Sequence, residues 1–243
     1  MDGIKAVFYK ELLGYFATPL AYIFISLFLF ASGIFTFYLG NFYERGIADL
    51  ASFFIWLPWL FLFFIPAISM RLWAEEKKTG TIEILLSLPI QIWQMVLGKF
   101  LAAWSFAIIA LLLTFPLWIT VNYLGNPDNG VIFASYIGGI FLAGSYLAIG
   151  SCISTLTNNQ VIAFVLTITV CFLFNLTGFP VVMNFFTSIF PQFLLDVIVG
   201  FSFLSHFQDI TLGILNIKSL IYFTFFIILW LGINSLILTL KKE

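Results

Sequence analysis

Charge is scarce in this sequence. Asp, Glu, Lys and Arg together make up 9% of its 243 residues, against roughly 25% in an ordinary soluble domain. In contrast, 62% of the residues are hydrophobic and 20% are aromatic. So few charges could not cover a water-exposed surface, and the composition therefore indicates an integral membrane protein that contacts the lipid bilayer.

The sequence also lacks the features of nucleic-acid and metal-binding proteins. The net charge is −1, which excludes the basic surface that binds nucleic acid. The two cysteines, Cys152 and Cys171, lie within apolar runs, form no CxxC motif and have no histidine near them in sequence. We expect both to be packing residues, and we expect no metal site in this chain.

Long apolar runs dominate the sequence instead. A helix needs about twenty residues to cross a hydrocarbon core of about 30 Å. Six such runs predict six transmembrane helices, near residues 20–40, 51–71, 100–121, 131–156, 160–182 and 217–240. The first run has no small-residue cleavage motif, so it is predicted to be a retained span rather than a signal peptide. We expect an all-α, polytopic membrane protein in which residues 1–243 form a single domain.

Lysine and arginine are unevenly distributed around these runs. Basic residues are retained on the cytoplasmic side of membrane proteins. With the N-terminus inside, eight basic residues fall on the cytoplasmic side and two fall outside. The eight are Lys5, Lys10, Arg71, Lys77, Lys78, Lys99, Lys241 and Lys242, and the two are Arg45 and Lys218. Both termini are therefore predicted to be cytoplasmic, and residues 72–99 form the main cytoplasmic loop.

Residues 183–216 do not have the pattern of a transmembrane helix that crosses the whole bilayer. The segment is apolar, but it contains Pro191, Asp196, His206 and Asp209. A charged residue at the bilayer centre costs about 2.5–3.5 kcal/mol on insertion scales, so Asp196 argues against a full span. We expect two short re-entrant or interfacial helices on the outer side, before the last span.

Residues 1–19 allow two interpretations. They could form a helix along the inner membrane face, or they could simply extend the first span. The interfacial helix would place Ile4, Val7, Phe8, Leu12 and Phe16 toward lipid, and Lys5 and Lys10 near headgroups. Its polar residues are scattered around the helix, which weakens the amphipathic pattern.

The stretch RLWAEEKKTGTIEILLSLPI, residues 71–90, concentrates charge between two apolar runs. Trp73 lies where aromatic residues commonly meet the membrane interface. Gly80 permits a sharp turn, and Thr81 is a favourable N-cap for a helix that starts at the next residue. Glu83 would then lie in the first turn, where a carboxylate interacts favourably with the helix dipole.

The predicted helix is short and almost entirely apolar. Pro89 disfavours helix at the residue before it, which limits the helix to about seven residues. Glu83 and Ser87 form its one polar stripe, four residues apart. Such a helix must be buried. It either tucks under its own bundle at the membrane interface or docks into a soluble cytoplasmic partner, with Glu83 as the polar contact.

The same residues resemble the inner loop of ABC-2 type permeases. The shared pattern is Met-Arg, an acidic-basic cluster, Gly-Thr-x-Glu-x-Leu-Leu-x-x-Pro and Gly-Lys. It is carried here by Met70, Arg71, Glu75, Glu76, Lys77, Gly80, Thr81, Glu83, Leu85, Leu86, Pro89, Gly98 and Lys99. The stretch FSFLSHFQDITLGILNIKSLIYF resembles the outer re-entrant region and the start of the last span in that family.

Within the family, the chain is most similar to the permease subunit associated with gliding motility in Bacteroidota. Two positions depart from common family patterns, because Leu204 has no Pro near it and Asn216 has no acidic residue near it. These departures bear on the assignment to the gliding-motility subfamily and not on the resemblance to the ABC-2 family.

The resemblance implies half of the membrane unit of an ABC exporter in the bacterial inner membrane. It implies a coupling helix seated on a separate cytoplasmic P-loop ATPase, which uses ATP-Mg, and a second permease copy or a sister permease. This chain would then bind no cofactor and catalyse no reaction. The coupling residues implied are Arg71, Glu75, Glu76, Gly80, Thr81, Ile82, Glu83, Leu85, Leu86 and Pro89.

Few other residues suggest chemistry. Gly98-Lys99 is followed by Phe100 and lacks the upstream glycine of a GxxxxGK[ST] loop, so no ATP site is predicted here. His206 and Asp209 have helical i, i+3 spacing, which favours a polar pair at the outer interface over an ion or proton site. An intramembrane enzyme using these two residues and Asp196 is the competing enzymatic hypothesis.

Small and polar residues within the spans suggest packing roles. Gly144, Ala148 and Cys152 recur every four residues and allow close helix contact, within one subunit or across a dimer. Asn175 and Asn234 are expected to form helix-to-helix hydrogen bonds. The lack of charge is compatible with an amphipathic or lipid-like cargo. The remaining alternative is a non-transporting assembly protein whose loop helix anchors a partner without ATP.

Overall fold

The computed structural model describes residues 2–179, 182, 192–193, 199–213 and 216–241, and within these residues the chain is helical, without strands. The described residues form α1 (Asp2–Ala17), α2 (Pro19–Ile34), the π-helical turn η1 (Phe35–Leu39), α3 (Ala51–Ser69), α4 (Ala74–Thr79), α5 (Thr81–Ser87), α6 (Ile92–Leu112), α7 (Phe115–Leu124), α8 (Asn129–Leu156), α9 (Gln160–Leu176), α12 (Phe203–Thr211) and α13 (Ile217–Leu240). The all-α prediction is confirmed for the described residues.

Five apolar helical stretches in the described part of the chain are long enough to cross a membrane. They are Pro19–Leu39, Ala51–Thr79, Ile92–Leu124, Asn129–Leu156 and Ile217–Leu240. The sixth predicted span corresponds to α9, which is apolar but has only 17 residues, the short end of the range for a transmembrane helix. The chain is thus a multi-pass membrane protein, and a count of six stays a prediction.

The third predicted span, residues 100–121, is divided differently in the structure. Helix α6 begins eight residues earlier, at Ile92, and ends at Leu112, while α7 continues from Phe115. Thr114 lies at the break, where its hydroxyl bonds the Leu111 carbonyl and the Tyr136 hydroxyl. Pro116 in the first turn of α7 explains the break, because proline disfavours helix just before it. Pro116 therefore predicts a helix break here, but the continuous apolar run around it indicated a single span.

Helix α8 is the centre of the bundle, and it packs against α3, α6, α9, α12 and α13. Its small residues permit this, since a methyl group added to Gly139 would lie 2.9 Å from Leu57 of α3. Two buried hydrogen bonds also tie neighbours to α8. Tyr146 donates to Asn175 of α9 over 2.8 Å, and Asn234 of α13 donates to Ser151 over 2.8 Å. Both asparagines therefore join helices, as predicted.

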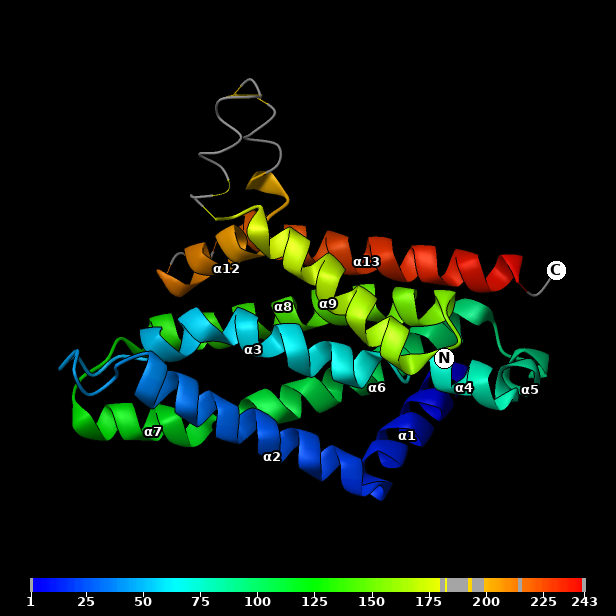
Figure 1. Ribbon diagram of the computed structural model, residues 1–243, viewed down its shortest axis with the longest axis horizontal. Helices are drawn as coiled ribbons and strands as arrows, with labels where there is room; N and C mark the ends of the chain where they lie inside the picture. Colours follow the sequence, from blue (N-terminus) through cyan, green and yellow to red (C-terminus); the bar gives the residue numbers. More distant parts are fainter. Residues whose placement is uncertain (1, 180–181, 183–191, 194–198, 214–215, 242–243) are drawn as a thin grey trace.

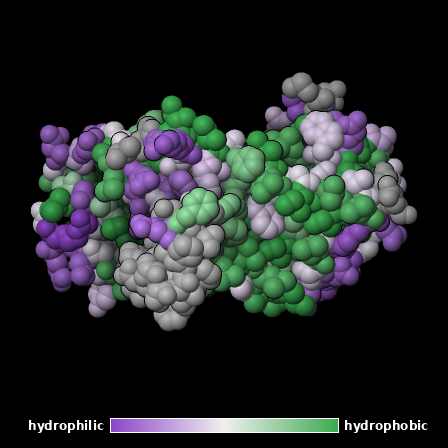
Figure 2. Space-filling model, turned by 90° about the horizontal axis from the view of Figure 1, so that it is seen from above, coloured by the Kyte–Doolittle hydropathy of each residue, from purple (hydrophilic) through white to green (hydrophobic). Residues whose placement is uncertain are grey.

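The elements are strung along one long axis (Figure 1). Both chain termini and the pair α4–α5 lie at one end, while α7 lies at the other. Figure 2 shows hydrophilic residues toward both ends of this axis and a hydrophobic band between them. This arrangement is typical of a bundle whose ends meet water and whose middle meets lipid.

Helix α1 is separate from α2, because the chain turns at Thr18 before Pro19 starts the next helix. It packs along α6. Val7, expected to face lipid, is instead buried, with Gly98 of α6 beside it. Ile4, Phe8, Leu12 and Phe16 are half-buried. The expected lipid face is thus largely a packing face, since α6 offers it a closer apolar surface.

Only part of the predicted outer region, residues 183–216, is described. Helix α12 is amphipathic and buries Phe203, Leu204, Phe207 and Ile210 against the bundle. Asp196 lies outside the described residues. The expectation of a re-entrant path through the membrane therefore stays a prediction.

Candidate coupling site

The segment between α3 and α6 folds as two short helices joined by a left-handed residue. Helix α4 ends at Gly80, which has φ +72° and serves as the N-cap of the seven-residue α5. This conformation favours glycine, as the sequence suggested. The prediction that Thr81 caps the helix is wrong. Thr81 is the first helical residue, and its hydroxyl donates to the Glu76 carbonyl.

Helix α5 has one buried side and one exposed side. Leu85 is 9% exposed and joins the core of the bundle, whereas Ile84 is 68% and Leu88 is 44% exposed. Glu83 is exposed in the first turn. Of the two interpretations, packing under the chain's own bundle accounts for Leu85 but not for Ile84 or Leu88. Leu85 attaches α5 to its own bundle, and Ile84 and Leu88 remain outside with Glu83.

The start of α4 is fixed to the centre of the bundle. The hydroxyl of Ser154 in α8 accepts hydrogen bonds from the backbone N–H groups of Trp73 and Ala74, at 3.2 and 3.0 Å, and donates to the Met70 carbonyl. The indole of Trp73 donates to Ser151, one turn earlier on α8. One serine thus satisfies three backbone groups where the chain leaves α3.

Trp73 is fully buried, although its position suggested an interface residue. Ser151, the acceptor of its indole, also accepts from Asn234 of α13, which in turn accepts from Thr155 over 2.6 Å. This buried network connects α4 with both α8 and α13. Nothing in the sequence pairs these residues, because they lie about eighty positions apart along the chain.

Lys99 is the buried charge of this region. Its side chain is 2% exposed, and its Nζ lies 2.9 Å from Glu11 of α1 and 2.7 Å from Glu76 of α4. The same nitrogen lies 5.2 Å from the ring centroid of Trp73, within the range of a cation–π contact. Lys99 therefore ties α1, α4 and α6 together, and Glu76 of the loop is an ion-pair partner rather than a solvated side chain.

Gly98, next to Lys99, sets how closely α1 approaches α6. A methyl group added there would lie 2.9 Å from Val7 and 3.1 Å from the Ile4 carbonyl of α1. Side-chain carbons do not come so close, so only glycine permits this contact. The Gly-Lys pair of the sequence pattern is accordingly a docking point for α1 rather than a phosphate-binding element.

Two further lysines meet at the C-terminal end of α8. Lys77 and Lys241 both donate to the Thr155 carbonyl, one of the last carbonyl groups of that helix. The two ammonium groups thus share one backbone acceptor at the end of the central helix.

The remaining predicted residues occupy other places. Gly144, Ala148 and Cys152 are buried on α8, and a methyl group on Gly144 would lie 2.9 Å from Ile227 of α13 and 3.0 Å from Trp104 of α6. Their stripe faces the interior of the subunit. Of the coupling residues, Ile82 and Leu86 are half-buried, while Glu75 and Pro89 are exposed.

His206 and Asp209 are not joined as the spacing suggested. The His206 ring stacks on Tyr222 of α13, with centroids 4.1 Å apart, and its nitrogens bond Ser219 and the Gly200 carbonyl. Asp209 is exposed. His206 thus fastens α12 to the start of α13, and this geometry gives no support to a catalytic pair.

The family can now be assigned. The family model described as "ABC-2 family transporter protein" matches residues 31–240, which is most of the chain. The chain belongs to the ABC-2 transporter family. Among curated proteins, none matches it significantly. As a member of this family with several membrane-spanning helices, it is a membrane permease of an ABC transporter.

Proposed function

We propose that this ABC-2 permease is half of an exporter in the bacterial inner membrane, driven by a separate cytoplasmic P-loop ATPase. The observation that carries the proposal is the surface of α5 and its C-cap Leu88, where Ile84 and Leu88 are exposed beside Glu83. Apolar side chains exposed at a hydrophilic end of the molecule are typical of a protein contact site. The position of α5 beside both termini supports a cytoplasmic location (Figure 1).

Movement of α5 would reach the spans through α4. The ATPase would press on α5, and Trp73 with its hydrogen bonds to Ser151 and Ser154 would carry the displacement to α8 and, through Asn234, to α13. In this mechanism ATP-Mg is bound and hydrolysed by the ATPase, and this chain supplies no catalytic residue. Its role is to change between inward-facing and outward-facing states.

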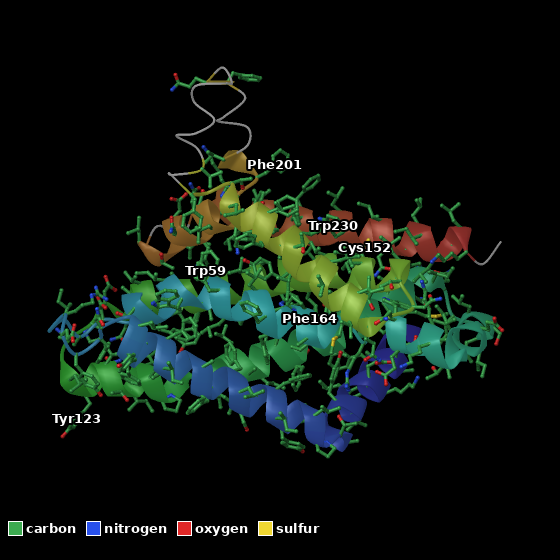
Figure 3. The ribbon with its side chains drawn as sticks, in the orientation of Figure 1. Trp59, Tyr123, Cys152, Phe164, Phe201 and Trp230 are labelled. Atoms are coloured by element: carbon green, nitrogen blue, oxygen red, sulfur yellow. The ribbon has the colours of Figure 1, made fainter. Side chains whose placement is uncertain are left out.

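The membrane unit would contain a second copy of this chain or a sister permease. Gliding motility is the process that the sequence resemblance favours. The lack of charge within the spans favours an amphipathic or lipid-like cargo, and the groove between α2, α3 and α9, of about 530 Å³ and with apolar lining residues, would hold the apolar part of such a molecule. Trp59 of α3 and Phe164 of α9 belong to this lining (Figure 3).

Purification of the tagged chain from its native membranes in mild detergent, followed by mass spectrometry, tests the proposal. Recovery of a soluble P-loop ATPase in a fixed ratio to the permease is the expected result. If envelope proteins are abundant and an ATPase is absent, the chain is an assembly anchor and the exporter proposal is wrong.

Substitutions in α5 test the contact itself. Ile84→Asp should reduce ATPase recovery by about tenfold or more, because it places an unpaired charge in an apolar contact. Glu83→Ala should weaken recovery less, by the loss of one polar contact. Gln91→Asp is the matched control, since it adds the same charge at an exposed N-cap position beyond the coupling residues. Leu85→Asp is unsuitable, because Leu85 is part of the permease's own core.

A further inference from the structure

A charged cavity lies where α1, α2, α3, α4 and α6 meet. Its volume is about 280 Å³ and it is open on one side. Three basic residues, Lys10, Arg71 and Lys99, and three acidic residues, Glu11, Glu75 and Glu76, contribute to its lining. The wall is therefore balanced in charge, although the chain as a whole has very little charge.

Two atoms of this wall have unused hydrogen-bonding capacity. Among the described residues, Nε of Arg71 and Oε2 of Glu76 are buried without a hydrogen-bond partner. Lys99 uses only Oε1 of Glu76, so the second carboxylate oxygen is left free. One unused atom is a donor on a cation and the other is an acceptor on an anion. A buried group of either kind is costly unless it is paired.

The charged cavity lies next to the apolar groove between α2 and α3. Phe24 of α2 and Ala67 of α3 line both spaces. Beyond them, the groove has aromatic and aliphatic lining residues, including Phe28 and Trp59. A molecule that filled both spaces would have a charged end of a few atoms and a long apolar end.

We propose that the cavity binds the headgroup of a zwitterionic phospholipid of the phosphoethanolamine type, with its acyl chains in the groove. The phosphate would accept from the Arg71 guanidinium, and the ammonium would donate to Oε2 of Glu76. Arg recognises phosphate with several fixed donors. Only an amine with N–H bonds satisfies the carboxylate oxygen, so a choline headgroup fits less well. The proposal concerns binding alone and does not depend on coupling to an ATPase.

The test uses the full-length protein in mild detergent, mixed with equal amounts of phosphatidylethanolamine, phosphatidylcholine and phosphatidylglycerol of identical acyl chains. Native mass spectrometry then measures the lipid retained per chain. Preferential retention of phosphatidylethanolamine is expected. Equal retention of the three lipids, or a preference for either of the others, overturns the proposal.

Charge variants locate the site. Arg71→Gln should reduce retention of phosphatidylethanolamine by about tenfold, the loss expected for a charge-assisted hydrogen bond. Arg45→Gln is the matched control, because Arg45 pairs with Asp49 away from the cavity. Glu76→Gln should bring phosphatidylethanolamine and phosphatidylcholine to equal retention. Equal effects of Arg71→Gln and Arg45→Gln contradict the assignment.

A variant that fills the cavity without disturbing the fold distinguishes loss of lipid binding from misfolding. Gly14 lines the cavity, and a methyl group added there meets no atom within 4 Å. Gly14→Leu should therefore fold and obstruct the cavity, whereas Gly33→Leu, on an equally open position of α2, should retain lipid. Competition with soluble glycerophosphoethanolamine identifies the source of the headgroup. No displacement supports a lipid, and full displacement shows that the free zwitterion is the ligand and overturns the lipid assignment.

Discussion

Lys99 is buried between the carboxylates of Glu11 and Glu76, in a chain that otherwise has few charges. Removing one partner of a buried ion pair leaves uncompensated charge, which costs about 3–5 kcal/mol. Lys99→Met should therefore lower thermal stability in detergent by several degrees. Lys78→Met removes the same charge from an exposed position and is the control. Equal melting temperatures for the two variants would show that the Lys99 cluster contributes nothing.

Single residues also show what could be read from the sequence and what could not. Gly80 was predicted to make a turn, because glycine has no side chain and adopts a left-handed conformation without strain. The partners of Lys99 could not be predicted, since they lie 88 and 23 positions away along the chain. Trp73 was predicted to lie at the membrane interface, because only its position at the end of an apolar run could be read from the sequence. Its burial depends on Ser151 of α8, which no local pattern connects with it.

At the level of elements, α1 depends on one glycine of α6. Gly98→Val would force α1 away from α6, because side-chain carbons would overlap Val7 and the Ile4 carbonyl. The expected result is faster tryptic cleavage after Lys5 and Lys10 in the folded protein, measured by mass spectrometry. Gly232→Val on α13 is the control, since a methyl group there meets nothing within 4 Å. Unchanged cleavage in Gly98→Val would argue that α1 docks by other contacts.

Hydropathy predicted which segments form the membrane helices, but it did not predict where all of them begin and end. The spans containing α2, α3, α8 and α13 were placed within a few residues, because long apolar runs are strong signals. The start of α6 was missed by eight residues, since Ile92–Lys99 contains polar residues that belong to the docking face for α1. The sequence left open whether α5 packs under its own bundle or against a partner, because it does not show which apolar side chains reach the bundle.

For the whole molecule, the predicted orientation places α5 inside and α7 outside. Tyr123 of α7 is 90% exposed, and Ser87 of α5 is exposed. Cys152 and Cys171 are buried, so the native background should label weakly. A membrane-impermeant maleimide should label Tyr123→Cys in intact cells, and Ser87→Cys only after permeabilisation. The reverse pattern would place both termini outside and exclude a cytoplasmic ATPase as the partner of α5.

The most direct test of the whole account is photo-crosslinking from position 84 in native membranes. A benzophenone amino acid replaces Ile84, and the control replaces Phe225, an exposed residue of α13. The account predicts crosslinks from position 84 to a cytoplasmic P-loop ATPase, and none to that ATPase from position 225. Crosslinks from position 84 only to this chain, or to an envelope protein without a P-loop, would contradict the assignment of α5 as the coupling helix.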